Sequence, residues 1–212
     1  MGLFKKFVNQ TRKPEGLLGK LMLRTMNSGH ALMADWGMSL LDIDEPHEIA
    51  ELGCGGGRNI HELLKKYSSS KVTAIDYSPL SVERSRKYNR KMIESGRCTV
   101  EQGDVSKLEL EAGKFDLATA FETIYFWPGL EKCFAEVAKI LKPGGYFMIV
   151  NESDGKDATS LKFEKIIDGM KTYTPESIEA ALKSAGLSVV KSEHHGSMPW
   201  IMILSQKPAI QQ

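Results

Sequence analysis

The 212-residue sequence predicts an α/β fold in which a doubly wound, mostly parallel β-sheet is covered by helices. Three observations predict this class: apolar strands alternate with amphipathic helices from residue 46 onward, a glycine-rich loop follows the first strand, and two adjoining strands end the pattern. With 42% hydrophobic residues, the chain can bury the core of one domain with a short appendage. Ligands bind such sheets beyond the carboxyl ends of the strands, so the glycine-rich loop marks where a site is expected.

The expected elements follow one another closely along the chain. The strands are short and apolar, and they occupy residues 47–52, 71–75, 98–102, 115–121, 146–151, 187–192 and 200–205. The helices carry apolar residues three and four positions apart, as in the stripe of Ile60, Leu63, Leu64 and Tyr67. Three more helices are expected over 79–95 before Gly96, over 130–141 before Pro143-Gly144-Gly145, and over 175–185 before Gly186.

Residues 1–45 differ in charge from the domain expected over 46–212. Six basic residues and one acidic residue give positions 1–24 a net charge of +5. Between residues 28 and 41, four apolar residues share one face of an expected helix: Leu32, Met33, Trp36 and Leu40. We expect an N-terminal helical arm or lid. A solvated arm leading into a packed helix is the simpler interpretation, and docking on an anionic ligand or a membrane surface is the alternative.

Composition excludes several classes of protein. Lys and Arg total 28 and Asp and Glu total 27, so the net charge of +1 argues against a strongly basic nucleic-acid groove. The longest apolar runs, 146–150 and 200–204, are too short to cross a bilayer, and no secretory signal is evident. The three cysteines are scattered without metal-ligand spacing. We therefore expect a cytoplasmic protein with no metal site and no membrane partner, and the sequence is silent on its oligomeric state.

The glycine-rich loop has the spacing Glu51-x-Gly53-x-Gly55-x-Gly57. It departs from the dinucleotide fingerprint because Arg58 stands at the third glycine position, and no Lys-Ser or Lys-Thr pair follows to make a phosphate loop. The Glu51 carboxylate would repel a pyrophosphate, but it suits a ligand with an ammonium or sulfonium charge. Glycines let the backbone approach a ligand closely, although a turn that only packs a helix onto the sheet would have the same composition.

Two further acids follow the second and third strands. Asp76, with Tyr77 beside it, can accept hydrogen bonds from both hydroxyls of a ribose; a helix N-terminal charge is the alternative. Asp104 can accept a hydrogen bond from the exocyclic amine of adenine while the Val105 N–H donates to a ring nitrogen. The alternative for Asp104 is a turn-forming residue.

Together these motifs resemble the class I S-adenosylmethionine-dependent methyltransferase family over roughly residues 46–205, with Phe115-Asp116-Leu117 and Leu141-Lys-Pro-Gly-Gly145 as further matching segments. The resemblance implies a Rossmann-like methyltransferase fold with seven strands, the last antiparallel, and S-adenosyl-L-methionine as the cofactor. It also implies that the glycine loop holds the methionine end of the cofactor, Asp76 the ribose and the Gly103-Asp104 turn the adenine. Tyr77, Val105 and Phe121 complete the candidate cofactor-binding set.

The acceptor is expected beside the segment that follows the fourth strand. Glu122 is the first candidate for binding or deprotonating an acceptor, and a hydrogen-bonding residue at a strand end is the alternative. Tyr125 and Trp127 are candidates to surround the donor or an aromatic acceptor, with a place in the core as the alternative. Glu152 ends the fifth strand at the same edge of the sheet.

Histidine offers another general base, because imidazole titrates near neutrality. His195 follows the sixth strand and is included as a catalytic candidate, and His194 and His30 could also reach the crevice. A loop histidine is, however, more often exposed than catalytic.

We expect a methyltransferase acting on a small molecule. The segment after the fourth strand is not the Asn/Asp-Pro-Pro-Tyr sequence of related adenine and glutamine N-methyltransferases, and the chain has no Pro-Cys nucleophile for attack on cytosine. Two alternatives stay open: an RNA or protein methyltransferase that docks through the +5 arm, and a cofactor-binding sensor or scaffold without turnover.

Overall fold

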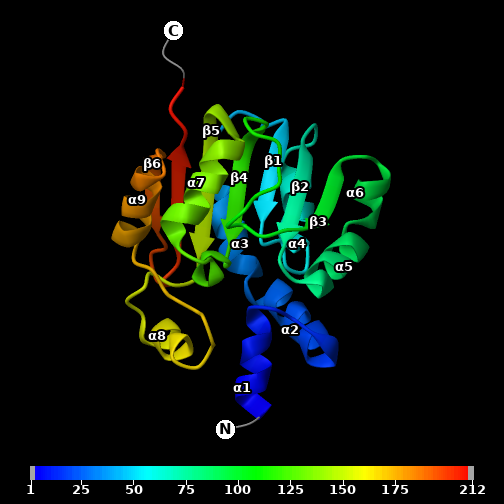
Figure 1. Cartoon of the computed structure of the whole chain (residues 1–212), viewed down its shortest axis with the longest axis vertical. Helices are drawn as coiled ribbons and strands as arrows, with labels where there is room; N and C mark the ends of the chain where they lie inside the picture. The colour runs from blue at the N-terminus through cyan, green and yellow to red at the C-terminus, as the bar shows by residue number, and fades with distance from the viewer. Residues whose placement is uncertain (1–2, 210–212) are drawn as a thin grey trace.

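The computed structural model describes residues 3–209, apart from the side chains of residues 3, 4, 17 and 24–28. Seven strands form a sheet in the order β3-β2-β1-β4-β5-β7-β6 (Figure 1). They are β1 (Glu48–Leu52), β2 (Lys71–Asp76), β3 (Cys98–Gln102), β4 (Phe115–Phe121), β5 (Leu141–Asn151), β6 (Ser188–His194) and β7 (Ile201–Gln206). β7 is antiparallel to both of its neighbours, and the other paired strands are parallel. The predicted fold class is confirmed.

The order of the strands reverses beside β1. The chain places β2 and β3 on one side of β1 and then returns to place β4 on its other side. Ligand crevices in open parallel sheets lie at such a reversal, beyond the carboxyl ends of the strands. The glycine loop after β1 and the Phe121-Glu122 segment at the end of β4 therefore flank the expected crevice.

Helices cover both faces of the sheet. After β1 the helices are α4 (Arg58–Lys66), α5 (Pro79–Tyr88), α6 (Arg90–Glu94), η2 (Ile124–Phe126), α7 (Leu130–Ile140), α8 (Ala158–Glu164) and α9 (Pro175–Ser184). Successive side chains of a strand point to opposite faces, and β1 follows this rule. Ala50 and Leu52 belong to the core cluster that includes α7 and α9, whereas Ile49 belongs to the cluster that includes α3 and α4.

The N-terminal part consists of α1 (Leu3–Val8), η1 (Asn9–Thr11), α2 (Gly16–Gly29) and α3 (Ala31–Ser39). α3 packs on the sheet, and Gly37 lies so close to β5 that an added Cβ would be 2.6 Å from Val150 Cγ1. Figure 1 shows α1, α2 and α8 at the end of the molecule toward which the arrow of β1 points. The arm therefore lies at the carboxyl ends of the parallel strands. Across the described part of the chain, no helix combines the length and apolar character that a membrane crossing needs.

Two expected helix boundaries differ from the structure. The helix expected over 79–95 is divided into α5 and α6 at Asn89, whose buried Nδ2 donates hydrogen bonds to the carbonyls of Gly57 and Ser85 at 2.8 and 3.1 Å. The helix expected over 28–41 is divided at His30. The buried face of α3 also differs from the expected apolar face, because Leu32 is 74% exposed while Met33 is buried.

The strand expected over 146–151 begins earlier. β5 starts at Leu141, which pairs with Phe115, so Pro143-Gly144-Gly145 lies within the strand instead of separating it from α7. The register with β4 shifts between Phe115 and Leu117, which accommodates this irregular segment. The sequence pattern also did not predict α8.

Candidate cofactor and acceptor site

A cavity of about 260 Å³ opens at the carboxyl ends of the central strands. Seven of the nine candidate cofactor residues line it: Gly53, Gly55, Asp76, Tyr77, Asp104, Val105 and Phe121. Glu122 and Trp127 line the same cavity, which joins the expected cofactor and acceptor regions. Thr11, Arg12, Pro14, Leu23 and His30 of the N-terminal part line it as well. Sequence reasoning did not assign the first four of these, because no local pattern shows which distant segment covers a site.

The glycine loop has a backbone that other residues adopt rarely. Gly53, Gly55 and Gly57 have φ angles of 85°, 51° and 83°. The N–H groups of Gly53 and Cys54 donate to the carbonyl of Ile75 at the end of β2, at 2.9 and 3.0 Å. A Cβ on Gly53 would lie 2.2 Å from Thr123 Oγ1, whereas a Cβ on Gly55 would meet nothing within 4 Å. The loop therefore leaves open space at Gly55, on the side of the cavity.

Gly57 and Glu51 are not among the residues that line this cavity. A Cβ on Gly57 would lie 2.6 Å from Ser85 Oγ and 2.7 Å from Asn89 Nδ2, so this glycine allows α4 and α5 to approach each other. Glu51 is buried beneath the loop, and Thr119 Oγ1 donates a hydrogen bond to it. Burial raises the pKa of Glu51 to about 8, the Thr119 hydrogen bond lowers it, and the nearby Asp76 charge raises it further. Burial thus favours the protonated form of Glu51 over the charged carboxylate that the sequence predicted beside the loop.

The Asp76 carboxylate is fixed by backbone donors. Oδ2 accepts a hydrogen bond from the Gly55 N–H at 2.8 Å, and Oδ1 accepts one from the Ser78 N–H at 2.9 Å. Burial raises the pKa of Asp76, and these hydrogen bonds oppose that effect. A carboxylate has about four lone-pair sites, so both oxygens keep room for a further donor from a ligand. Asp104 is held similarly, because its Oδ1 accepts a hydrogen bond from the Ser106 N–H at 2.8 Å.

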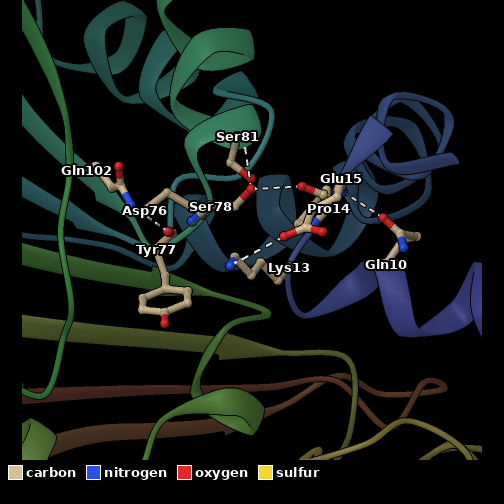
Figure 2. A network of polar contacts seen from close by, with 9 residues as sticks. All are labelled: Gln10, Lys13, Pro14, Glu15, Asp76, Tyr77, Ser78, Ser81 and Gln102. Atoms are coloured by element: carbon tan, nitrogen blue, oxygen red, sulfur yellow. Dashed lines mark hydrogen bonds and ion pairs between the residues drawn. The ribbon is translucent and has the colours of Figure 1, made fainter. Parts of the chain in front are cut away.

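The N-terminal arm docks on the turn that contains Asp76 (Figure 2). The buried Ser78 hydroxyl donates a hydrogen bond to the Pro14 carbonyl at 3.0 Å. Lys13 Nζ lies 5.6 Å from the centre of the Tyr77 ring, a cation–π contact. The Glu15 N–H donates to Gln10 Oε1, which ties the arm together beside this contact. The arm is thereby coupled directly to the residues that follow Asp76.

At the other end of the cavity, Glu122 has an unusual backbone. Its φ of 55° is the one positive value among the described non-glycine residues. Such a conformation costs about 1–3 kcal/mol and persists only where neighbouring contacts hold it. The Tyr125 hydroxyl donates to Glu122 Oε1 at 3.0 Å, and the Glu152 N–H donates to the same oxygen. These two hydrogen bonds therefore fix the direction of the carboxylate and help to hold the strained backbone.

His30 faces Glu122 and Glu152. Its Nδ1 lies 3.5 Å from Glu122 Oε2 and 3.3 Å from Glu152 Oε1. Burial raises the pKa of Glu122 to about 7, an effect that the charge of His30 opposes and that of Glu152 reinforces. Burial lowers the pKa of His30, but the two carboxylates outweigh this effect and raise it. One ligand atom from each of the three residues lies within 4.8 Å of the others, so the group could hold a metal ion, which the sequence did not predict.

The remaining acceptor candidates have different positions. Tyr125 is buried behind Glu122, where its hydroxyl also accepts a hydrogen bond from the Ser153 N–H at 3.1 Å. Burial raises the pKa of Tyr125 well above its usual value, so it stays a neutral donor. Trp127 lines the cavity with part of its surface but stacks on Phe147 in the core. Both residues thus support the wall of the cavity.

His195 is not among the residues that line the cavity. Its ring packs against Trp36 and Trp200, with centroid distances of 5.5 and 4.7 Å. Its Nδ1 accepts hydrogen bonds from the N–H groups of Ser197 and Met198. These contacts give His195 a structural place in the loop between β6 and β7, and of the candidate histidines only His30 reaches the cavity.

The matching family model and the similar curated proteins are all described as methyltransferases. Residues 50–149 match the family model described as a methyltransferase domain. The sterol 24-C-methyltransferase of Debaryomyces hansenii is 28% identical over 178 residues, which cover 78% of this chain and 47% of that protein. The sterol 4-C-methyltransferase of Caenorhabditis elegans is 25% identical over 190 residues, covering 85% of this chain and 55% of its own length. The chain thus spans about half the length of these relatives.

Solved structures share the fold at low sequence identity. An O-methyltransferase family protein from Burkholderia thailandensis has a TM-score of 0.80 at 17% identity, over 97% of this chain and 63% of its own. The [4+2]-cyclase SpnF has a TM-score of 0.69 at 16% identity, over 84% of this chain and 81% of its own. At such identities the likeness concerns the fold alone.

Proposed function

This chain belongs to the class I S-adenosylmethionine-dependent methyltransferases, and from that premise we propose that it transfers a methyl group from S-adenosylmethionine to a small-molecule acceptor. The observation that carries the proposal is the shared cavity, which joins Asp76 and the glycine loop at one end to Glu122 at the other. A donor and an acceptor bound in one cavity can be aligned for direct displacement. Such alignment can lower a barrier by about 7–11 kcal/mol in well-oriented systems.

The residues of the cavity fit the cofactor. The open space at Gly55 is a cradle that a Cβ would enter, and Asp76 keeps lone pairs for two hydroxyl donors. We assign Asp76 to the ribose, Asp104 and Val105 to the adenine, and Gly53 and Gly55 to the methionine end. Tyr77 and Phe121 would add contact with the bound nucleoside.

When bound, the cofactor supplies a methyl group on a positively charged sulfur. The residues of this chain would orient both reactants and keep water away from them. Phe121 and Trp127 are buried apolar walls of the cavity, and the arm of residues 1–45 covers it as a lid on the domain at 46–212. Glu122 would bind the acceptor or remove its proton, since burial brings the pKa of its carboxyl to about 7.

The cavity favours a compact acceptor. Pockets for small molecules usually measure about 300–1,000 Å³, and a cofactor would already take up much of the 260 Å³ present here. The relatives named above act, by their names, on sterols, and they are about twice as long as the matched region. We therefore propose an acceptor smaller than a sterol. The three cysteines, free and buried, fit a reducing cytoplasm, which is where we place the protein.

Calorimetry and a labelled-methyl assay test this function. We expect the protein to bind S-adenosylmethionine and S-adenosylhomocysteine, and to transfer labelled methyl groups to a component of pooled small metabolites. Indifference to both nucleosides together with binding of NAD or ATP would refute the cofactor assignment. Tight binding with a persistent lack of transfer would favour a sensor or another reaction, since a [4+2]-cyclase shares this fold.

A further inference from the structure

At the acceptor end of the cavity, two carboxylates surround one imidazole: Glu122 and His30 line the cavity, and Glu152 Oε1 lies 3.3 Å from His30 Nδ1. Glu122 follows β4, Glu152 follows β5, and His30 lies between α2 and α3, so three distant segments bring these groups together. With all three ionised, the cluster has two negative charges and one positive charge. An excess negative charge in a partly buried cluster is costly, and a bound cation removes that cost.

Neither of the other two cations of the cavity is among the described groups that act on Glu122. Arg58 donates two hydrogen bonds to Asp35, at 2.8 and 2.7 Å. Arg12 lies over Gly169, where an added Cβ would be 2.6 Å from Arg12 Nη1. Among the described residues that line the cavity there is no other arginine and no lysine. The positive charge that the cluster lacks would therefore come from a ligand.

We propose, on the basis of the methyl-transfer function above, that the acceptor is an amine whose ammonium form binds between Glu122 and Glu152. An ammonium offers up to three N–H donors and no acceptor, which complements two carboxylates that can only accept. An ionised phenol or a carboxylate would be repelled by the same groups. A neutral carbon acceptor would add no donor to either carboxylate and would leave the excess negative charge of the cluster unbalanced.

Glu122 is oriented for this role before the ligand arrives. Its Oε1 is occupied by the Tyr125 hydroxyl and the Glu152 N–H, so Oε2 is the oxygen left for a further partner. His30 faces that same oxygen and also Glu152 Oε1, which marks the point where the free acceptor positions converge. Glu122 is a candidate catalytic residue here, and Tyr125 is a positioning residue.

The reaction balances in protons and electrons. The bound ammonium gives one proton to the Glu122 carboxylate, whose Oε2 is the oxygen left for a further partner. The freed nitrogen lone pair forms a bond to the methyl carbon while the C–S bond breaks, and the electron pair of that bond stays on sulfur. The products are a methylated ammonium, neutral S-adenosylhomocysteine and one proton on Glu122. The groups in contact with the Glu122 carboxyl are His30, the Glu152 N–H and the Tyr125 hydroxyl.

The test compares amines with alcohols of the same shape on the S-adenosylhomocysteine complex. The pairs are benzylamine with benzyl alcohol, cyclohexylamine with cyclohexanol, and propylamine with propanol. Calorimetry on chelator-treated protein at neutral pH measures each affinity, and labelled transfer to the amine nitrogen is a second readout. We expect the amine of at least one pair to bind about tenfold more tightly than its alcohol, with no pair reversed.

Variants separate the cluster from a general charge effect. Glu122→Gln and Glu152→Gln should each reduce the amine preference by about tenfold or more while S-adenosylhomocysteine still binds. Glu83→Gln removes an exposed carboxylate of α5 and should leave the preference unchanged. A preference that survives both cluster variants would contradict the assignment.

The remaining outcomes would overturn the amine assignment alone or both proposals together. Equal affinities within every pair, or tighter binding of alcohols, would overturn the amine assignment and leave the proposed methyl transfer standing. Failure to bind S-adenosylhomocysteine would remove both proposals. Amine binding that requires added zinc would assign His30, Glu122 and Glu152 to a metal and overturn this inference.

Discussion

Replacing Gly57 with alanine should destabilise the fold much more than the same change at Gly55. Both glycines have positive φ angles, 83° and 51°, so each substitution should cost about 1–2 kcal/mol in backbone strain. Only at Gly57 does the new Cβ collide with its surroundings, 2.6 Å from Ser85 Oγ and 2.8 Å from Ser85 Cα. Forcing an extra methyl group into a packed site costs about 1–3 kcal/mol more.

The expected loss is therefore about 2–5 kcal/mol for Gly57→Ala and about 1–2 kcal/mol for Gly55→Ala. Urea unfolding with both variants measured beside the wild type gives these values, provided that the slopes agree. S-adenosylhomocysteine affinity should show the opposite order, because the Cβ at Gly55 enters the cavity and the one at Gly57 does not. If Gly57→Ala costs no more stability than Gly55→Ala, the packing role assigned to Gly57 is wrong.

Three other predictions concern the acids and the arm. Asp76→Ala should weaken S-adenosylhomocysteine binding by about 1–3 kcal/mol in calorimetry, because it removes the carboxylate proposed to hold the ribose; unchanged affinity would dismiss that role. Because burial raises the pKa of Glu51 to about 8, the folded protein keeps a proton that the unfolded chain releases above about pH 4.5, so the free energy of unfolding should fall between about pH 5 and 8. Glu51→Gln should flatten that fall in urea titrations, and an unaltered slope would speak against the raised pKa. Ser78→Ala removes the hydrogen bond to the Pro14 carbonyl, worth about 1 kcal/mol, and should speed tryptic cleavage after Arg12 about fivefold. Ser78→Thr keeps the hydroxyl as a control, and equal cleavage rates in all three proteins would show that this contact does not hold the arm.

The fold was predictable because its signals are local. Strands 98–102 and 115–121 have the same bounds in the structure as in the prediction, and the glycine loop follows β1 as expected. Periodicity of two or about 3.6 residues is set within a few turns of chain, so it survives without knowledge of distant contacts. The same holds for the positions of Asp76 and Asp104 at the ends of neighbouring strands.

The cavity was less predictable because its lining depends on distant packing. Gly55 and Gly57 are equivalent in the sequence pattern, yet one faces the cavity and the other faces α5. His30 and His195 were comparable as candidate bases, and only the packing of the arm and of Trp36 and Trp200 separates them. Alternation along the chain thus decides which strands form and where a crevice opens. The side chains that meet there, and the protons they keep, follow from burial and long-range contacts that no short segment encodes.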